Sequence, residues 1–179
     1  MRIIKVNAIP STNDFARELY RQNGPEAPLC VVAYDQTRGK GQRGAGWQSN
    51  PGENLTFSLL FSDLNLKNGE QFLLSAAVSI AIQEFLLKNQ IPAVSVKWPN
   101  DIMSGNKKLA GILIENILKQ DKLAASVIGI GLNVNQTEFA GLPKACSLKK
   151  LTGIHFETQH LLQQILEYLE AEINLLKID

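Results

Sequence analysis

The chain has 179 residues, with 45% hydrophobic and 20% charged residues, a balance typical of one soluble globular domain. Its formal net charge of +1 excludes a whole-molecule field that would attract nucleic acid or anionic lipid. No apolar run approaches the roughly eighteen residues of a membrane span, and the N-terminus lacks the apolar core of a secretory signal. We therefore expect a cytoplasmic protein with no nucleic-acid or membrane partner, and we expect Cys30 and Cys146 to be buried free thiols.

The first half of the chain predicts two helices separated by two strands. Residues 14–23 have helical periodicity after three capping residues, and Gly24 and Pro25 end the helix. Residues 29–34 and 55–61 are apolar runs of strand length. Residues 70–89 carry apolar side chains at helical spacing and predict a well-buried helix. The capping residues are Ser11, Thr12 and Asn13.

The second half predicts three strands and a closing helix. The strands cover residues 94–98, 108–115 and 122–134, and an amphipathic helix covers residues 160–176. Because the connections between these strands are short and turn-like, we expect antiparallel pairing. The fold class predicted is α+β, a mostly antiparallel or mixed β-sheet with the helices packed on one face, in a single domain over residues 1–179.

A glycine-rich stretch, TRGKGQRGAGW at 37–47, contains G-x-G-x-x-G at Gly39, Gly41 and Gly44. A dinucleotide fingerprint needs a helix after the glycines, but Pro51 and Gly52 precede a strand here. A Walker A loop is excluded because no Gly-Lys precedes Ser or Thr at the required spacing. A nucleic-acid tail is disfavoured because the rest of the chain supplies no basic run or face.

The same stretch is suited to a phosphate. Glycine exposes backbone N–H groups to close approach, and Arg38, Lys40 and Arg43 add positive charge. We expect a mobile lid that closes over an anion and excludes water. A solvated surface loop is the alternative, although Trp47 at its end needs something to pack on.

A second stretch, VKWPNDIMSGNKKLAGILIE at 96–115, places polar groups at a sheet corner. Asp101 follows Pro99 and Asn100 at a turn. Strand alternation predicts that Lys108 shares a face with Ala110 and the apolar residues after it. An exposed, snorkelling lysine and an ordinary turn aspartate remain the alternatives.

Five segments together resemble biotin protein ligases: STN at 11–13, QTRGKGQRGAGW at 36–47, KWPND at 97–101, KLAGILIE at 108–115 and GIGLNVN at 129–135. The resemblance implies the class II aminoacyl-tRNA synthetase/biotin ligase-like fold. It also implies the reaction, in which biotin and ATP give biotinyl-5'-adenylate and pyrophosphate. The biotinyl group then passes to a lysine of a biotin carboxyl carrier protein domain.

The resemblance also assigns site residues. ATP and Mg²⁺ are implied, with no tightly bound prosthetic group, and Asp101 is a candidate Mg²⁺ ligand or a guide for the acceptor lysine. The catalytic candidates are Lys108, Arg43, Lys40 and Asp101. The biotin-binding candidates are Ser11, Thr12, Asn13, Gln36, Gly39, Lys40, Trp47, Lys108, Gly111 and Gly131. The candidates for ATP or the adenylate are Arg38, Lys40, Gln42, Arg43, Trp47, Asn100, Lys108 and Asn133.

The sequence departs from the resemblance in two respects. The usual loop pattern is G-R-G-R-x-G-R, and here Lys40, Gln42 and Ala45 take the arginine positions. Both the N-terminal DNA-binding domain and the small C-terminal β-barrel domain of many such ligases are expected to be absent. A lipoate or octanoate ligase or transferase, or a non-catalytic biotin-binding module, remains the alternative. A homodimer is favoured by analogy alone.

Overall fold

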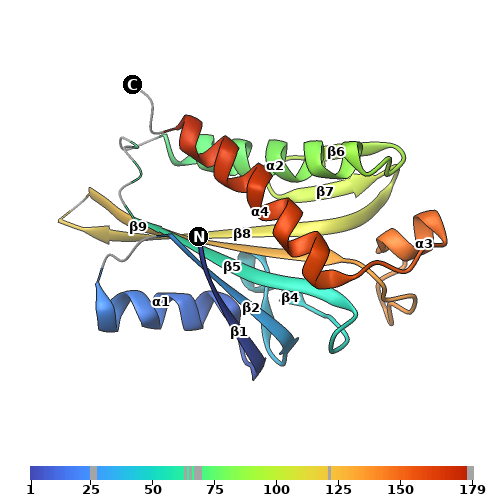
Figure 1. Ribbon diagram of the computed structural model, residues 1–179, viewed down its shortest axis with the longest axis horizontal. Helices are drawn as coiled ribbons and strands as arrows, with labels where there is room; N and C mark the ends of the chain where they lie inside the picture. The colour runs from blue at the N-terminus through green and yellow to red at the C-terminus, as the bar shows by residue number, and fades with distance from the viewer. Residues whose placement is uncertain (25–27, 63, 65, 67–69, 121, 177–179) are drawn as a thin grey trace.

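The computed structural model describes residues 1–24, 28–62, 64, 66, 70–120 and 122–176, and it contains a seven-stranded sheet (Figure 1). The strands run in the order β1-β2-β5-β9-β8-β7-β6. β1 and β2 are parallel and every other neighbouring pair is antiparallel. Their bounds are β1 Arg2–Ile9, β2 Leu29–Gln36, β5 Asn54–Ser62, β6 Val94–Lys97, β7 Asp101–Ser104, β8 Lys107–Lys119 and β9 Lys122–Asn133.

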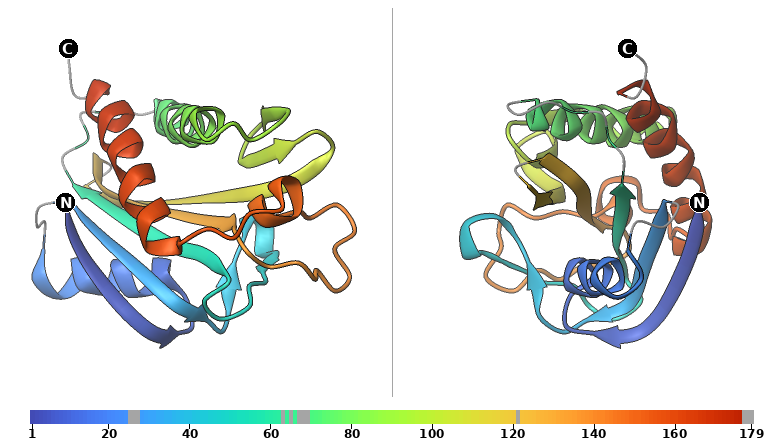
Figure 2. Two further views of the ribbon diagram at one scale, coloured as in Figure 1. Left: turned by 45° about the vertical axis from the view of Figure 1, so that its right-hand side comes forward. Right: turned by 90° about the vertical axis from the view of Figure 1, so that its left-hand side faces the viewer.

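Helices cover both faces of this sheet. α2 (Gln71–Lys88) and α4 (Thr158–Leu175) pack on one face with the larger apolar core, whereas α1 (Thr12–Asn23) packs on the opposite face with a smaller one (Figures 1 and 2). The α+β fold class is confirmed. The expectation that the helices share one face is wrong for α1, which joins the parallel strands β1 and β2 and crosses beneath the sheet between them.

The two faces of the central strands differ in chemistry. On β5 and β9, large side chains such as Phe57 and Ile130 point toward α2 and α4. The alternate positions hold Ser58, Gly129 and Gly131, which face the α1 side because side chains alternate along a strand. The α1 side of the sheet is therefore polar and has room near the glycines.

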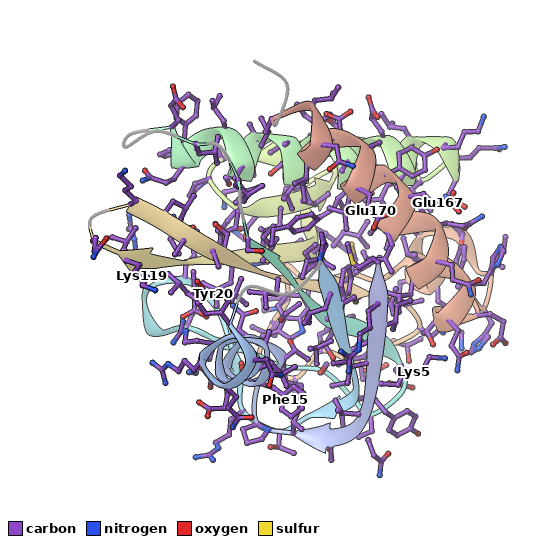
Figure 3. The ribbon with its side chains drawn as sticks, turned by 60° about the vertical axis from the view of Figure 1, so that its left-hand side comes forward. Lys5, Phe15, Tyr20, Lys119, Glu167 and Glu170 are labelled. Atoms are coloured by element: carbon purple, nitrogen blue, oxygen red, sulfur yellow. The ribbon has the colours of Figure 1, made fainter. Side chains whose placement is uncertain are left out.

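The α1 side also has its own packing. Phe15 and Tyr20 of α1 pack against the smaller core, while Glu167 and Glu170 lie on α4 across the sheet (Figure 3). Ser11 caps α1 by accepting a hydrogen bond from the Asp14 N–H at 3.4 Å. This cap fixes the start of α1 at the edge of the open region.

α2 is the one helix among the described residues whose length and hydropathy match a membrane span. Its inner residues, including Leu74 and Phe85, are fully buried in the larger core. This arrangement is that of a core helix, which passes the same test of length and composition. Phe72 and Leu87 remain exposed on its outer side.

The predicted helices and strands are present, with ends that differ by a few residues, and Cys30 and Cys146 are buried and free as expected. Pro25 lies outside the described residues. Sequence analysis missed β1, which mixes charged and apolar residues at a sheet edge, and β7, which was taken as a turn. It also missed the short helix α3 (Leu148–Thr152) and the two-residue strands β3 (Gly39–Lys40) and β4 (Gly46–Trp47).

Candidate functional site: an acid pocket and an apolar pocket joined at Lys108

The first cavity, of about 240 Å³, lies on the α1 side of the sheet. The start of α1 forms one wall, β8 and β9 form the floor, and the β3–β4 hairpin forms the cover. Gly111, Gly129 and Gly131 supply the floor, so backbone rather than side chain faces the space. This cavity is called the acid pocket below.

One end of the acid pocket is lined by neutral polar groups. The Gln36 side-chain oxygen accepts hydrogen bonds from the Thr12 N–H at 2.9 Å and from the Thr12 hydroxyl at 3.0 Å. The Ser58 Oγ lies 2.7 Å from the Thr12 Oγ1 and 2.6 Å from the Asn13 Oδ1. These linked hydroxyl and amide groups hold one another in place and suit a ligand with both hydrogen-bond donors and acceptors.

Asn13 is braced from behind the pocket. Its Nδ2 donates to the Glu115 carboxylate at 2.7 Å and to the Leu113 carbonyl at 3.3 Å. Arg17, one turn along α1, forms an ion pair with the other oxygen of Glu115. A side chain at Gly129 would overlap the Asn13 amide, so this position requires glycine.

A β-bulge delivers Lys108 to the acid pocket. Ile102 pairs with Ala110 but Met103 pairs with Lys108, so Leu109 is an extra residue in β8. Leu109 and Ala110 both face the larger core. The expectation that Lys108 shares the face of Ala110 is therefore wrong, because the extra residue reverses the alternation.

Lys108 and Asp101 form the charged centre of the site. The Lys108 Nζ lies 2.6 Å from the Asp101 Oδ1, and the Lys97 Nζ lies 4.0 Å from the other oxygen. The Lys108 side chain is 36% exposed and packs over Gly111, while Asp101 is only 19% exposed. The amine is therefore held by a single close carboxylate and remains accessible from the pocket.

A second cavity, of about 320 Å³, adjoins the first and is mainly apolar. Phe139, Leu142 and Pro143 line it, together with Lys108 and Asn133. This cavity is called the apolar pocket below, and it exists because the following segment returns to the sheet where β9 departs. There the Lys108 N–H donates to the Lys144 carbonyl at 2.6 Å, and the Cys146 N–H donates to the Lys108 carbonyl at 3.0 Å.

Asn133 holds this returning segment in place. Its Nδ2 donates to the Cys146 carbonyl at 2.9 Å, and the side chain is nearly fully buried. Asn133 was expected beside an adenine or ribose. It lines the apolar pocket, but its amide N–H already has a protein partner.

Trp47 separates the two pockets and lines both of them. Its indole lies against β8 and β9, where a side chain at Gly131 would overlap the ring and one at Gly111 would lie 3.2 Å from Cζ3. The Lys108 Nζ lies 5.9 Å from the ring centroid. The close neighbour of these two glycines, expected to be a ligand, is therefore the indole ring.

The cations of the lid are distributed differently from the expectation. Arg38 and Arg43 are exposed and line neither pocket, because Arg38 precedes the β3–β4 hairpin and Arg43 lies at its tip. Gln42 and Lys40 line the acid pocket instead. Lys40 forms an ion pair of 2.7 Å with Asp14 on α1, which ties the lid to the pocket wall.

The structure thus brings most predicted residues together. Those lining the acid pocket are Ser11, Thr12, Asn13, Gln36, Lys40, Gln42, Trp47, Asn100, Asp101, Lys108, Gly111 and Gly131. Gly39 lies behind the pocket, where a side chain would overlap the Trp47 backbone. Sequence analysis missed Ser58, Glu115 and Gly129, although strand alternation back from Gly131 would have found Gly129.

Asp101 does not fit as a metal ligand supplied by the protein alone. Both of its oxygens face lysine amines. Within the described ranges, no group of three or more His, Cys, Asp or Glu side chains is placed to hold a metal ion. Magnesium would have to enter with a triphosphate, which commonly supplies most of its ligands besides water.

The sheet order, the helices on its two faces and the paired pockets define a class II aminoacyl-tRNA synthetase/biotin ligase-like α+β domain. The sequence profile of the Biotin/lipoate A/B protein ligase family matches residues 6–133. The chain belongs to this family.

Several characterised proteins are similar to the chain. It is 37% identical over 169 residues to the bifunctional ligase/repressor BirA of Bacillus spizizenii, covering 92% of this chain and 51% of that protein. It is 31% identical over 152 residues to the biotin–[acetyl-CoA-carboxylase] ligase of Mycobacterium tuberculosis, covering 81% and 54% of the two chains. The chain therefore spans about half the length of these relatives.

Solved structures show the same fold. The biotin protein ligase from Aquifex aeolicus, in complex with biotin and ATP, has a TM-score of 0.80 and 28% identity over 97% of this chain and 70% of that one. The Leishmania major biotin protein ligase with biotinyl-5-AMP has a TM-score of 0.76 and 26% identity over 97% and 75%. These likenesses concern the fold and a comparable extent of chain.

Proposed function

We propose that the protein is a biotin protein ligase that activates biotin with ATP and transfers the biotinyl group to a lysine of a biotin carboxyl carrier protein domain. The observation that carries the proposal is the position of Lys108, which lines both the acid pocket and the apolar pocket. An amine at that junction can contact a carboxylate from one side and a phosphate from the other. Relatives named as biotin ligases support this proposal.

In the first step, a biotin carboxylate oxygen attacks the α-phosphorus of ATP, and the bond to the bridging oxygen of pyrophosphate breaks. Both reactants are anionic, so a fixed amine that attracts both lowers the repulsion between them. Lys108 supplies that amine, and Asp101 orients it. Magnesium arriving with ATP would offset charge on the leaving pyrophosphate.

In the second step, the amine of the acceptor lysine attacks the biotinyl carbonyl, AMP leaves and the nitrogen loses a proton. Asp101 lies at the mouth of the acid pocket beside Asn100, close to where an incoming amine would arrive. Closure of the β3–β4 hairpin would protect the adenylate from water before the carrier docks.

The polar end of the acid pocket favours biotin over simple alkanoates. Thr12, Asn13 and Gln36 match a ureido ring, which offers two N–H donors and one carbonyl acceptor. An octanoate chain would bury these polar groups against methylenes and leave hydrogen-bonding capacity unused. The mainly apolar second pocket suits the adenine base.

The test is pyrophosphate exchange into ATP, measured with biotin, lipoate and octanoate in turn. Exchange is expected with biotin, and Lys108→Ala should reduce it by roughly a hundredfold or more. Lys107→Ala is the matched control, because Lys107 is the exposed neighbour on β8 and lines neither pocket. Exchange driven by lipoate alone would replace biotin as the substrate. Biotin binding without exchange would identify a non-catalytic binding module.

A further inference from the structure

The indole N–H of Trp47 is an unexplained polar group at the site. Among the described residues, Trp47 Nε1 is the one buried side-chain nitrogen or oxygen atom without a hydrogen-bond partner. Buried N–H groups in native proteins are nearly always paired, so an exception at a binding site points to a partner that comes with the ligand.

The orientation of the ring shows which ligand atoms the N–H can reach. The Cε2 atom, which is bonded to Nε1, lies against Gly131 on β9, while the far edge of the ring at Cζ3 lies over Gly111 on β8. The N–H edge is therefore on the β9 side. β9 ends two residues later at Asn133, which lines the apolar pocket.

The charge around the ring favours an anionic acceptor. The Lys108 amine is 5.9 Å from the ring centroid, and Trp47 lines both pockets where they meet. An oxygen held near Lys108 at this junction would meet a cation and a neutral donor together.

We infer that the Trp47 indole N–H donates a hydrogen bond to a phosphoryl oxygen of the bound adenylate, which makes Trp47 a direct ligand of the reacting phosphate. This inference rests on the proposed function. The interaction gives the lid a reason to end in tryptophan rather than another aromatic residue. It also supplies a phosphate donor from the lid, where Arg38 and Arg43 lie outside the pockets.

Indole NMR tests the inference on the intact protein. The chain has two tryptophans, so protein labelled with [indole-¹⁵N]tryptophan gives two N–H signals, and Trp98→Phe assigns them. Trp98 is 83% exposed. The probes are biotin, which carries only a carboxylate, and the adenylate ester of the biotin alcohol, which keeps the phosphoryl oxygens and lacks the carboxylate.

The Trp47 proton signal is expected to move downfield and to exchange more slowly with solvent on addition of the adenylate ester, but not with biotin alone. The same shift with biotin alone would assign the bond to the carboxylate and overturn the phosphoryl assignment. No shift with the ester, or faster solvent exchange, would show that the indole has no bond to the ligand or leaves its position.

Kinetics give a second readout through Trp47→Phe, which keeps an aromatic ring over Gly131 and removes the N–H. Its kcat/KM for ATP in the exchange assay should fall by about ten- to a hundredfold, the range for losing a hydrogen bond to a charged group. Its affinity for biotin should stay within a few-fold. Wild-type exchange with biotin, together with an unaltered Trp47→Phe, would reject the inference while leaving the proposed function intact. If the wild type shows no exchange with biotin, the proposed function fails.

Discussion

The Lys108 amine and the Asp101 carboxylate form an ion pair of 2.6 Å across the β-bulge between β7 and β8. Asp101 pairs in register with Gly111, three residues beyond the lysine. Without the extra residue Leu109, alternation would direct the amine into the larger core. The bulge and the carboxylate therefore act together to place one cation between the two pockets.

Asp101→Asn keeps the size of the side chain and removes the charge that holds Lys108. We expect the rate of biotin-dependent exchange to fall by roughly tenfold or more, because the amine is no longer held toward both anions. The melting temperature should change little at this partly exposed site. Lys97→Ala is the control, since Lys97 is 68% exposed and lies 4.0 Å from Asp101. An equal loss in both variants would contradict a specific role for the Asp101–Lys108 pair.

Two glycines on β9 should separate the functions of the acid pocket and the lid. In Gly129→Ala the new methyl group overlaps Asn13, and biotin affinity should fall by about tenfold in calorimetry. In Gly131→Ala the methyl group overlaps Trp47 instead. The indole should move into solvent, which red-shifts the Trp47 emission measured in a Trp98→Phe background. Identical effects from the two substitutions would refute this division of the floor.

Glu115 should tune biotin affinity without touching the ligand. Glu115→Ala removes the acceptor that orients the Asn13 amide and leaves Arg17 without its partner. We expect biotin affinity to fall by several-fold and the free energy of unfolding to fall by about 1–3 kcal/mol. Glu18→Ala, on the exposed side of α1, is the matched control. Unchanged biotin affinity in Glu115→Ala would show that the brace has no effect on the pocket.

Burial raises the pKa of the Cys30 thiol from its ordinary value of 9.0 to about 12. The folded state therefore holds this proton more tightly than the unfolded state. Its contribution to stability is complete below pH 9 and is lost as the pH rises toward 12, with a slope of about 1.4 kcal/mol per pH unit. Denaturant titrations of wild type and Cys30→Ala between pH 8 and about 11 measure the difference in slope. Parallel curves would contradict the prediction.

The sequence predicts the site better than it predicts the arrangement of the chain around it. Lys108 and Asp101 could be chosen because a lysine on an apolar strand and an acid at a corner are unusual. The side of the strand that carries Lys108 could not be chosen correctly, since a bulge depends on pairing with β7 and leaves no local pattern. The position of Arg43 likewise depends on how the hairpin turns. Edge strand β1 was missed because it is paired on one side only and carries polar residues.

The division of the sheet into two unlike faces has a practical consequence for engineering. The bulk of the apolar packing lies with α2 and α4, on the side away from the ligand pockets. Residues that would choose the acid and the nucleotide lie on the opposite side and in the hairpin cover. Substrate preference could therefore be redesigned by libraries confined to the glycine floor and the cover, while the layer that keeps the domain folded stays untouched.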